Sequence, residues 1–197
     1  MQHRHLPFRG AVRVYPTPDN LANRCELRVL DVDPHADAIP WPGPSTTTIT
    51  EPIDLDPFED ATPCKVLFLR RHVLFGGATG AGKSSGLNVL VGNLAACHDV
   101  VIWAVDLKKG SELGPWASCI DRLATTPDEA RALLADAVTI LEARAALLAE
   151  RGQRVWEPSP DMAALVIIID EYAELSHDAP DAIKHADSIA RRGRCRR

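Results

Sequence analysis

Residues 77–84 read Gly-Ala-Thr-Gly-Ala-Gly-Lys-Ser, which is a complete phosphate-binding loop. An apolar run at 72–75 precedes the loop, and a segment with apolar residues at helical spacing follows it at 84–96. A glycine-rich turn between a buried strand and a helix lets successive backbone N–H groups converge on phosphate oxygens, and the start of the helix adds its positive end. The sequence therefore predicts a nucleotide-binding site here. The alternative is a glycine-rich turn that binds nothing.

The side chains and the backbone of the loop are expected to have different roles in binding the nucleotide. We expect Lys83 to reach the terminal phosphates of the nucleotide and the hydroxyl of Ser84 to hold Mg²⁺. The backbone of the loop would surround the phosphates. The residues predicted to bind the nucleotide are Gly77, Ala78, Thr79, Gly80, Ala81, Gly82, Lys83, Ser84 and Ser85.

A second signal lies downstream, where the apolar residues 165–169 are followed by Asp170 and Glu171. Consecutive apolar residues, mostly β-branched, are typical of a central parallel strand that is buried on both faces. In P-loop proteins an acid at the end of such a strand helps to hold Mg²⁺, so we expect Asp170 to act together with Ser84. Glu171 would then be the base or orienting group for the attacking water. The alternative is that the two acids merely end a strand and cap the next helix.

The composition is that of a globular protein. With 46% hydrophobic and 25% charged residues, a chain of 197 residues can hold one α/β domain plus an appendage. The formal net charge of −5 argues against coating of nucleic acid by bulk electrostatics, so any DNA contact must be local. Five scattered cysteines without a Cys-x-x-Cys pair indicate neither a disulfide framework nor a zinc site. Because no apolar stretch could span a bilayer or serve as a signal peptide, we expect a cytoplasmic chain without a membrane segment.

The first part of the chain is predicted to be a small β appendage. Residues 9–15 and 24–32 are strand-like, and the proline-rich stretch 33–56 is expected to form an extended arm. A further strand is expected at 64–69. We therefore assign the appendage and its arm to residues 1–60 and a partial P-loop domain to residues 61–197.

The rest of the chain alternates between strand and helix. Residues 100–105 read as a buried strand. Residues 126–129, Thr-Pro-Asp-Glu, form a capping box with proline at the first helical position, and they open a long helix that runs towards Arg151 and stops at Gly152. This order predicts an α/β fold with a parallel, doubly wound sheet. The apolar seam that should pack the long helix on the sheet is Leu134, Val138, Leu141, Ala145 and Leu148.

Four segments of the chain resemble the motor domain of the FtsK/SpoIIIE DNA translocases, especially the actinobacterial plasmid-transfer relatives of the Tra type. They read Ile-Pro-Trp-Pro-Gly-Pro-Ser at 39–45, Arg-Arg-His-Val-Leu-Phe-Gly-Gly-Ala-Thr-Gly-Ala-Gly-Lys-Ser-Ser at 70–85, Asp-Leu-Lys-Lys-Gly-Ser-Glu-Leu-Gly-Pro-Trp at 106–116 and Ile-Ile-Ile-Asp-Glu-Tyr-Ala-Glu-Leu at 167–175. The resemblance implies a P-loop NTPase of the RecA-like, additional-strand type that uses ATP and Mg²⁺. It also implies assembly into a ring, usually a hexamer, that moves double-stranded DNA through its central pore.

The resemblance also assigns roles to particular residues. Lys83 and Ser84 would handle the phosphates and Mg²⁺, Asp170 the metal and Glu171 the hydrolytic water. Lys83 and Glu171 are therefore the predicted catalytic residues. Asp106 and Lys108 match a related segment of the family, and we assign them no catalytic role.

The chain departs from the family by stopping early. Relatives continue past residue 194 into another strand, which in this class lies between the P-loop strand and the strand that ends at Asp170. The resemblance therefore implies a sheet that is incomplete at its C-terminal side.

Three functions stay open from the sequence. The first is a DNA-dependent ATPase of the translocase type, acting in chromosome segregation or conjugative transfer. The second is a truncated, catalytically inert remnant that still binds nucleotide, because the later elements of the motor are missing. The third and weaker one is a small-molecule kinase, which the adjacent acids oppose because they suit water activation better than phosphoryl transfer to a metabolite.

Overall fold

A computed structural model describes residues 11–16, 25–31, 37, 39–58, 60–78 and 80–192. The chain divides into two compact units. The first unit comprises Met1–Pro42 with Asp54–Lys65, and the second comprises Gly43–Ile53 with Val66–Arg197. Part of the predicted arm therefore belongs to the second unit.

Four strands lie wholly or mainly in the first unit. They are β1 (Ala11–Pro16), β2 (Cys25–Leu30), β3 (Ile53–Pro57) and β4 (Pro63–Val66). β1 pairs with β2 in antiparallel orientation, and β3 and β4 form a second two-stranded sheet. The two strands predicted near the start of the chain are confirmed in the described residues. The strand predicted at 64–69 is shorter than expected, because β4 already ends at Val66.

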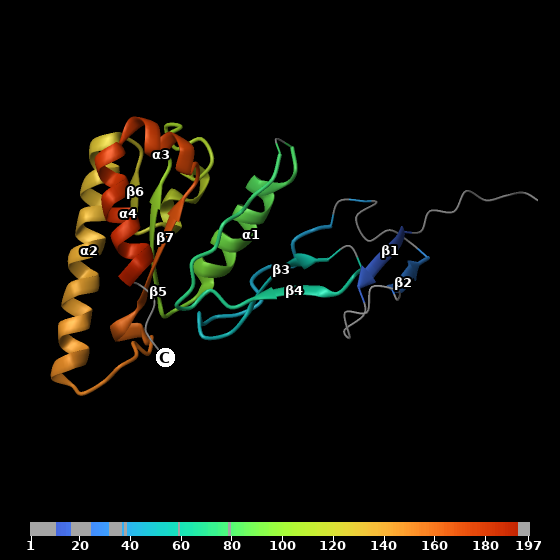
Figure 1. Cartoon of the computed structure of the whole chain (residues 1–197), viewed down its shortest axis with the longest axis horizontal. Helices are drawn as coiled ribbons and strands as arrows, with labels where there is room; N and C mark the ends of the chain where they lie inside the picture. Colours follow the sequence, from blue (N-terminus) through green and yellow to red (C-terminus); the bar gives the residue numbers. More distant parts are fainter. Residues whose placement is uncertain are drawn as a thin grey trace, which may run out of the picture. The chain divides into compact units, whose positions relative to one another are not determined.

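The second unit is built on a three-stranded parallel sheet with the strand order β6-β5-β7 (Figure 1). The strands are β5 (Val100–Val105), β6 (Arg122–Ala124) and β7 (Ala164–Ile169). Val105 lies opposite both Ala124 and Ile169, so the strands end together at one edge of the sheet. Asp106 and Asp170, which follow β5 and β7, are therefore brought to the same edge.

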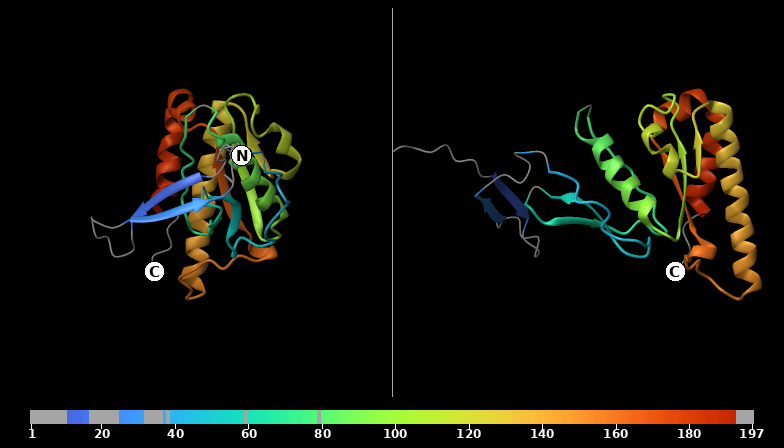
Figure 2. Two further views of the ribbon diagram at one scale, coloured as in Figure 1. Left: turned by 90° about the vertical axis from the view of Figure 1, so that its right-hand side faces the viewer. Right: turned by 180° about the vertical axis from the view of Figure 1, so that it is seen from behind.

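Helices cover both faces of this sheet (Figures 1 and 2). They are α1 (Lys83–Ala96), α2 (Pro127–Glu150), α3 (Tyr172–Asp178) and α4 (Pro180–Arg192), with 3₁₀ turns η1 (Gly114–Cys119) and η2 (Pro160–Met162). α1 lies on one face, and α2 and α4 lie side by side on the other. The predicted parallel, doubly wound α/β fold is confirmed in this unit. Among the described residues, every helix is too short or too polar to span a bilayer.

The core of the second unit lies between the sheet and α2, α3 and α4. Its buried residues are Val105, Ala124, Ala130, Leu133, Leu134, Leu175, Ala179 and Ala182. The predicted seam of α2 contributes less than expected: Leu134 is buried, Val138, Leu141 and Leu148 are half-buried, and Ala145 is exposed. The reason is length. A helix of 24 residues is about 36 Å long, whereas a strand of six residues such as β5 is about 20 Å long, so α2 extends past the sheet.

The predicted capping box at the start of α2 is confirmed. The Thr126 hydroxyl accepts a hydrogen bond from the backbone N–H of Glu129 at 3.3 Å. The Glu129 carboxylate accepts in return from the N–H groups of Thr125 and Thr126, at 2.8 and 3.1 Å. These hydrogen bonds, that of Thr125 foremost, lower the pKa of Glu129. At the other end of the helix Gly152 has a positive φ of 62°, which glycine tolerates best.

Replacing Thr126 by alanine should lower the free energy of unfolding by about 1 kcal/mol, because the N–H of Glu129 loses its acceptor. Urea unfolding followed by circular dichroism measures the loss. Thr139→Ala is the matched control: its exposed hydroxyl donates within α2 to the carbonyl of Ala135, and its removal should be almost neutral. Equal losses in both variants would contradict the cap.

Two buried polar side chains, Asn93 and Asp99, anchor part of the predicted arm to the second unit. The amide oxygen of Asn93 accepts from the backbone N–H and the hydroxyl of Ser45, at 2.7 and 2.9 Å. The carboxylate of Asp99 accepts from the hydroxyl of Thr48 at 2.6 Å and from the backbone N–H of Ile49 at 3.0 Å. Since buried polar groups are costly unless they are hydrogen-bonded, these contacts fix the path of the segment.

The prediction of a buried strand at 72–75 is wrong. The described residues 67–78 contain no strand, and Val73 and Leu74 expose 46% and 89% of their surface. A strand needs a neighbour for its backbone hydrogen bonds. β7 pairs with β5 along one edge, and no described strand pairs with its other edge. The apolar run leaves this edge of β7 unpaired and lies outside the sheet.

Candidate active site

The predicted phosphate-binding loop leads directly into α1. Lys83 is the first residue of the helix, and the preceding Gly82 has a φ of 83°. Gly80 has a φ of 79°, so both positions adopt a conformation that side chains with a Cβ rarely allow. The first turn of α1 contains no acidic residue, which leaves its positive end free to attract an anion. Thr79 lies outside the described residues. The local geometry fits a phosphate group.

The side chain of Lys83 folds back over the loop. Its ammonium donates to the backbone carbonyls of Gly77 and Ala78, at 2.7 and 3.0 Å. Lys83 and the two serines that follow it, Ser84 and Ser85, are exposed. Phosphate oxygens are stronger acceptors than neutral carbonyls, so a nucleotide could take over these hydrogen bonds. Lys83 is therefore placed to exchange its hydrogen bonds to the loop carbonyls for hydrogen bonds to a phosphate.

Asp106 organises the turn after β5. It is fully buried, and its carboxylate accepts from the backbone N–H groups of Lys108, Glu112 and Leu113, at 3.1, 3.0 and 3.0 Å. Three N–H donors satisfy a buried carboxylate without a cation. The turn thereby fixes the backbone from which the Lys108 side chain projects.

The two predicted acids follow β7 at the same edge of the sheet. The backbone N–H of Asp170 donates to the carbonyl of Val105 at 3.1 Å, which continues the pairing with β5 by one residue. Burial first, and the Asp106 carboxylate second, raise the pKa of the half-buried Asp170. Glu171 is the N-cap residue of α3, but its side chain makes no capping hydrogen bond. The capping alternative therefore does not account for this carboxylate.

Lys108 is the partner of Glu171. Its ammonium lies 3.4 Å from Oε2 of Glu171. The side chains of Lys108 and Glu171 are 44% and 43% exposed. Burial disfavours the charged form of Lys108, but the charges of Asp170 and Glu171 outweigh it and raise the pKa of this lysine. Sequence reasoning assigned Lys108 no catalytic role. The available signal was its position three residues after β5, at the edge where Asp170 also lies.

The two halves of the predicted site lie at the same end of the second unit, since the start of α1 and the end of β7 are both at its upper end in Figures 1 and 2. Each half has its own contacts: Lys83 binds its loop, and Glu171 binds Lys108. No hydrogen bond or ion pair between described residues joins the loop to either acid. A shared ligand between them stays a prediction.

The oxygen donors Ser84 and Asp170 suit Mg²⁺, a hard cation. In the described part of the chain, no three His, Cys, Asp or Glu side chains are grouped so that they could hold a metal alone. Mg²⁺ is usually held by one or two carboxylates together with the phosphates of the substrate. These residues therefore fit a metal that arrives with a nucleotide rather than a permanently bound ion.

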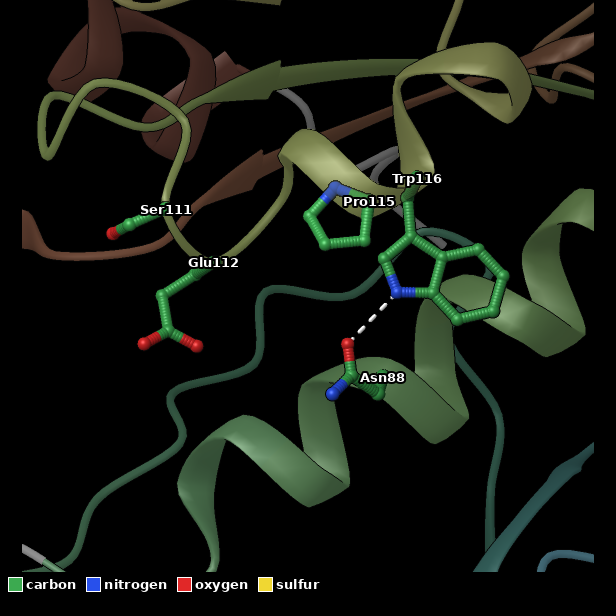
Figure 3. A pocket seen from close by; sticks show the side chains of 5 residues that line it. All are labelled: Asn88, Ser111, Glu112, Pro115 and Trp116. Carbon is green, nitrogen blue, oxygen red and sulfur yellow. Dashed lines mark hydrogen bonds between the residues drawn. The ribbon is translucent and has the colours of Figure 1, made fainter.

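A hollow of about 490 Å³ lies between α1 and the turn that Asp106 organises (Figure 3). The indole N–H of Trp116 crosses it and donates to the side-chain oxygen of Asn88 at 2.8 Å. This hydrogen bond ties the exposed first half of α1 to η1, and so connects the helix behind the phosphate-binding loop with the edge of the sheet. Sequence reasoning missed it: Trp116 ends the segment 106–116 that carries the resemblance, but nothing in the sequence pairs it with Asn88, 28 residues earlier. The lining residues are Asn88, Ser111, Glu112, Pro115 and Trp116.

Comparisons with known proteins agree with this architecture. The model of the FtsK/SpoIIIE family matches residues 47–164. A transfer protein, TraSA of Streptomyces ambofaciens, is 35% identical over 133 residues, which cover 60% of this chain and 32% of that protein. A sporulation regulatory protein of Streptomyces azureus is 35% identical over 102 residues, covering 50% of this chain and 33% of the relative.

The DNA translocase FtsK of Listeria monocytogenes is 30% identical over 145 residues, covering 61% of this chain and 19% of that protein. The chain thus spans a third or less of the length of these relatives. Among solved structures, the conjugation coupling protein TcpA of pCW3, in a monomer form with ATPγS, has a similar fold, with a TM-score of 0.63 and 20% identity over 95% of this chain and 57% of that one. Because the family model matches more than half of the residues, in a range that contains the P-loop and the strands β5 and β6, the chain belongs to the FtsK/SpoIIIE family.

Proposed function

We propose that this chain is a nucleotide-binding module of a DNA translocase, which couples ATP hydrolysis to the movement of double-stranded DNA in chromosome segregation or conjugative transfer. The observation that carries the proposal is the P-loop at the start of α1, which lies at the same end of the unit as Asp170 and Glu171. The names of the translocase and transfer relatives support the assignment to DNA movement.

In this proposal Lys83 and the loop backbone bind the β- and γ-phosphates of ATP. Ser84 and Asp170 would hold Mg²⁺, which would offset part of the negative charge of the phosphates. Glu171 orients a water molecule and accepts its proton as the water oxygen attacks the γ-phosphorus. The bond from that phosphorus to the bridging oxygen breaks, and ADP and phosphate are released.

DNA contact and ring assembly are further parts of the proposal, as is a cytoplasmic location. With a net charge of −5, the chain would bind DNA through a local basic surface. Two of its basic side chains already have acidic partners, because Arg70 pairs with Glu157 at 2.9 Å and Lys108 pairs with Glu171. A ring of several copies would add basic groups from each copy around one DNA molecule.

A second candidate function is nucleotide binding without turnover. The observation that favours it is the apolar run 72–75, which is not paired with the sheet. In that arrangement the loop of Lys83 is fixed by α1 behind it but by no strand in front of it. Binding of phosphate needs the loop alone, whereas hydrolysis needs the loop and Glu171 at matched positions.

Titration of the purified chain with a fluorescent ATP analogue, with and without Mg²⁺, and measurement of phosphate release, with and without double-stranded DNA, test both candidates. Mg²⁺-dependent binding and DNA-stimulated release support the translocase module. Mg²⁺-dependent binding without release at any DNA concentration supports the non-hydrolysing module. Absence of binding overturns both.

A further inference from the structure

An ion pair that spans two strands links the turn after β5 to the acids after β7. Lys108 and Glu171 are 63 residues apart in the sequence, and the register of Val105 against Ile169 brings them to one edge of the sheet. The ammonium of Lys108 lies 3.4 Å from Oε2 of Glu171. The pair therefore depends on the sheet and not on local sequence.

The two ends of this lysine differ in freedom. Its backbone N–H donates to the buried carboxylate of Asp106 at 3.1 Å, and this hydrogen bond fixes the backbone of Lys108. Its side chain is 44% exposed, so the ammonium can move with its partner. The neighbouring Lys109 has a φ of 60°, and no ion pair of a described residue involves its side chain. A fixed backbone and an ammonium paired with one carboxylate suit a residue that orients another side chain.

The ion pair engages one oxygen of the Glu171 carboxylate. Lys108 contacts Oε2, and no hydrogen bond from a described residue reaches Oε1. The ion pair therefore distinguishes the two oxygens of this carboxylate. The second oxygen stays available to accept a proton.

We propose that Lys108 is a positioning residue for the Glu171 carboxylate, holding Oε2 so that Oε1 faces the attacking water. The inference rests on the proposed function, because it concerns the base of that hydrolysis. Lys108 touches neither the nucleotide nor the water in this proposal. It acts through Glu171. The turn held by Asp106 determines the position of the Lys108 backbone.

The first test needs no nucleotide. The chain has five lysines, so the ammonium signals of ¹⁵N-lysine-labelled protein can be assigned with single Lys→Met variants, at mildly acidic pH and low temperature. Glu171→Gln should shift the signal of Lys108 and leave that of Lys109 unchanged. If the Lys108 signal does not respond, the pair is absent in solution and the inference is overturned, whatever the protein does with ATP.

The second test separates positioning from binding. Lys108→Met should lower kcat for phosphate release by about tenfold, since misplacing a catalytic group is costly, and leave the Kd of the fluorescent ATP analogue within about twofold. Lys109→Met is the matched control, with the same charge change one residue away and no expected effect. Lys108→Arg should restore part of the rate, because arginine can also hold one carboxylate oxygen.

Two results on the rate would overturn the positioning role: an unchanged kcat in Lys108→Met, or equal losses in the two Met variants. Failure of the proposed function looks different, because the unmodified chain would then release no phosphate. In that case the positioning role falls with the reaction, and the ammonium signal of Lys108 still shows whether the ion pair itself exists.

Discussion

Replacing Lys83 by methionine is expected to weaken binding of a fluorescent ATP analogue by about ten- to a hundredfold, since a hydrogen bond from a charged donor contributes about 1.5–3 kcal/mol. The ammonium of Lys83 is exposed, and its partners are two carbonyls of its own loop. Methionine keeps the aliphatic stem that lies near Gly77. The melting temperature should therefore stay almost unchanged while the affinity falls.

The matched control for this variant is Lys184→Met. Lys184 is an exposed lysine on α4 that pairs with Asp181 at 2.9 Å, far along the chain from the loop. The Lys184→Met substitution removes the same charge as Lys83→Met and should leave the affinity for the analogue unchanged. If both variants bind the analogue as tightly as the unmodified chain, the nucleotide does not use the P-loop, and the central assignment of this site is wrong.

The second large effect is expected on stability. Asp106→Ala should lower the free energy of unfolding by about 3 kcal/mol or more, because three backbone N–H groups in a buried turn lose their acceptor at once. The midpoint of urea unfolding measures the change. In the Asp106→Ala background, Glu171→Gln should no longer shift the ammonium signal of Lys108, because the turn no longer fixes the backbone of Lys108.

Two further variants test whether the turn is the cause. Asp136→Ala removes an exposed carboxylate that pairs with Arg122 at 2.6 Å, and should cost at most about 1 kcal/mol. Asp106→Asn keeps one acceptor oxygen of similar shape and should lose less stability than Asp106→Ala. A loss in Asp136→Ala as large as that in Asp106→Ala would show that the hydrogen bonds of the turn are not responsible.

The parts of the fold that sequence reasoning predicted correctly are those with local causes. The start of α2 follows from Thr126 and Glu129, which are three residues apart and bond to each other. β5 and β7 follow from continuous apolar runs of six residues, which are typical of strands inside a parallel sheet. The short strand β6 and the helices α3 and α4 were not predicted, because they depend on the sheet and α2 for their burial.

The errors and omissions have non-local causes. Residues 72–75 have the composition of a strand, but pairing requires a second strand at the right place, and composition cannot supply it. The roles of Asp106 and Lys108 depend on the register between β5 and β7. The roles predicted for Lys83, Ser84, Asp170 and Glu171 rest on motifs and stay predictions until the binding and hydrolysis experiments are done.

The unpaired edge of β7 has a practical consequence for every experiment above. Along this edge β7 pairs with no strand of the described residues, and its consecutive apolar side chains include no lysine or proline to discourage pairing. Two molecules in concentrated solution can join along such edges and form a dimer or a precipitate. Rates and affinities should accordingly be measured over a dilution series, with light scattering as a check on sample homogeneity.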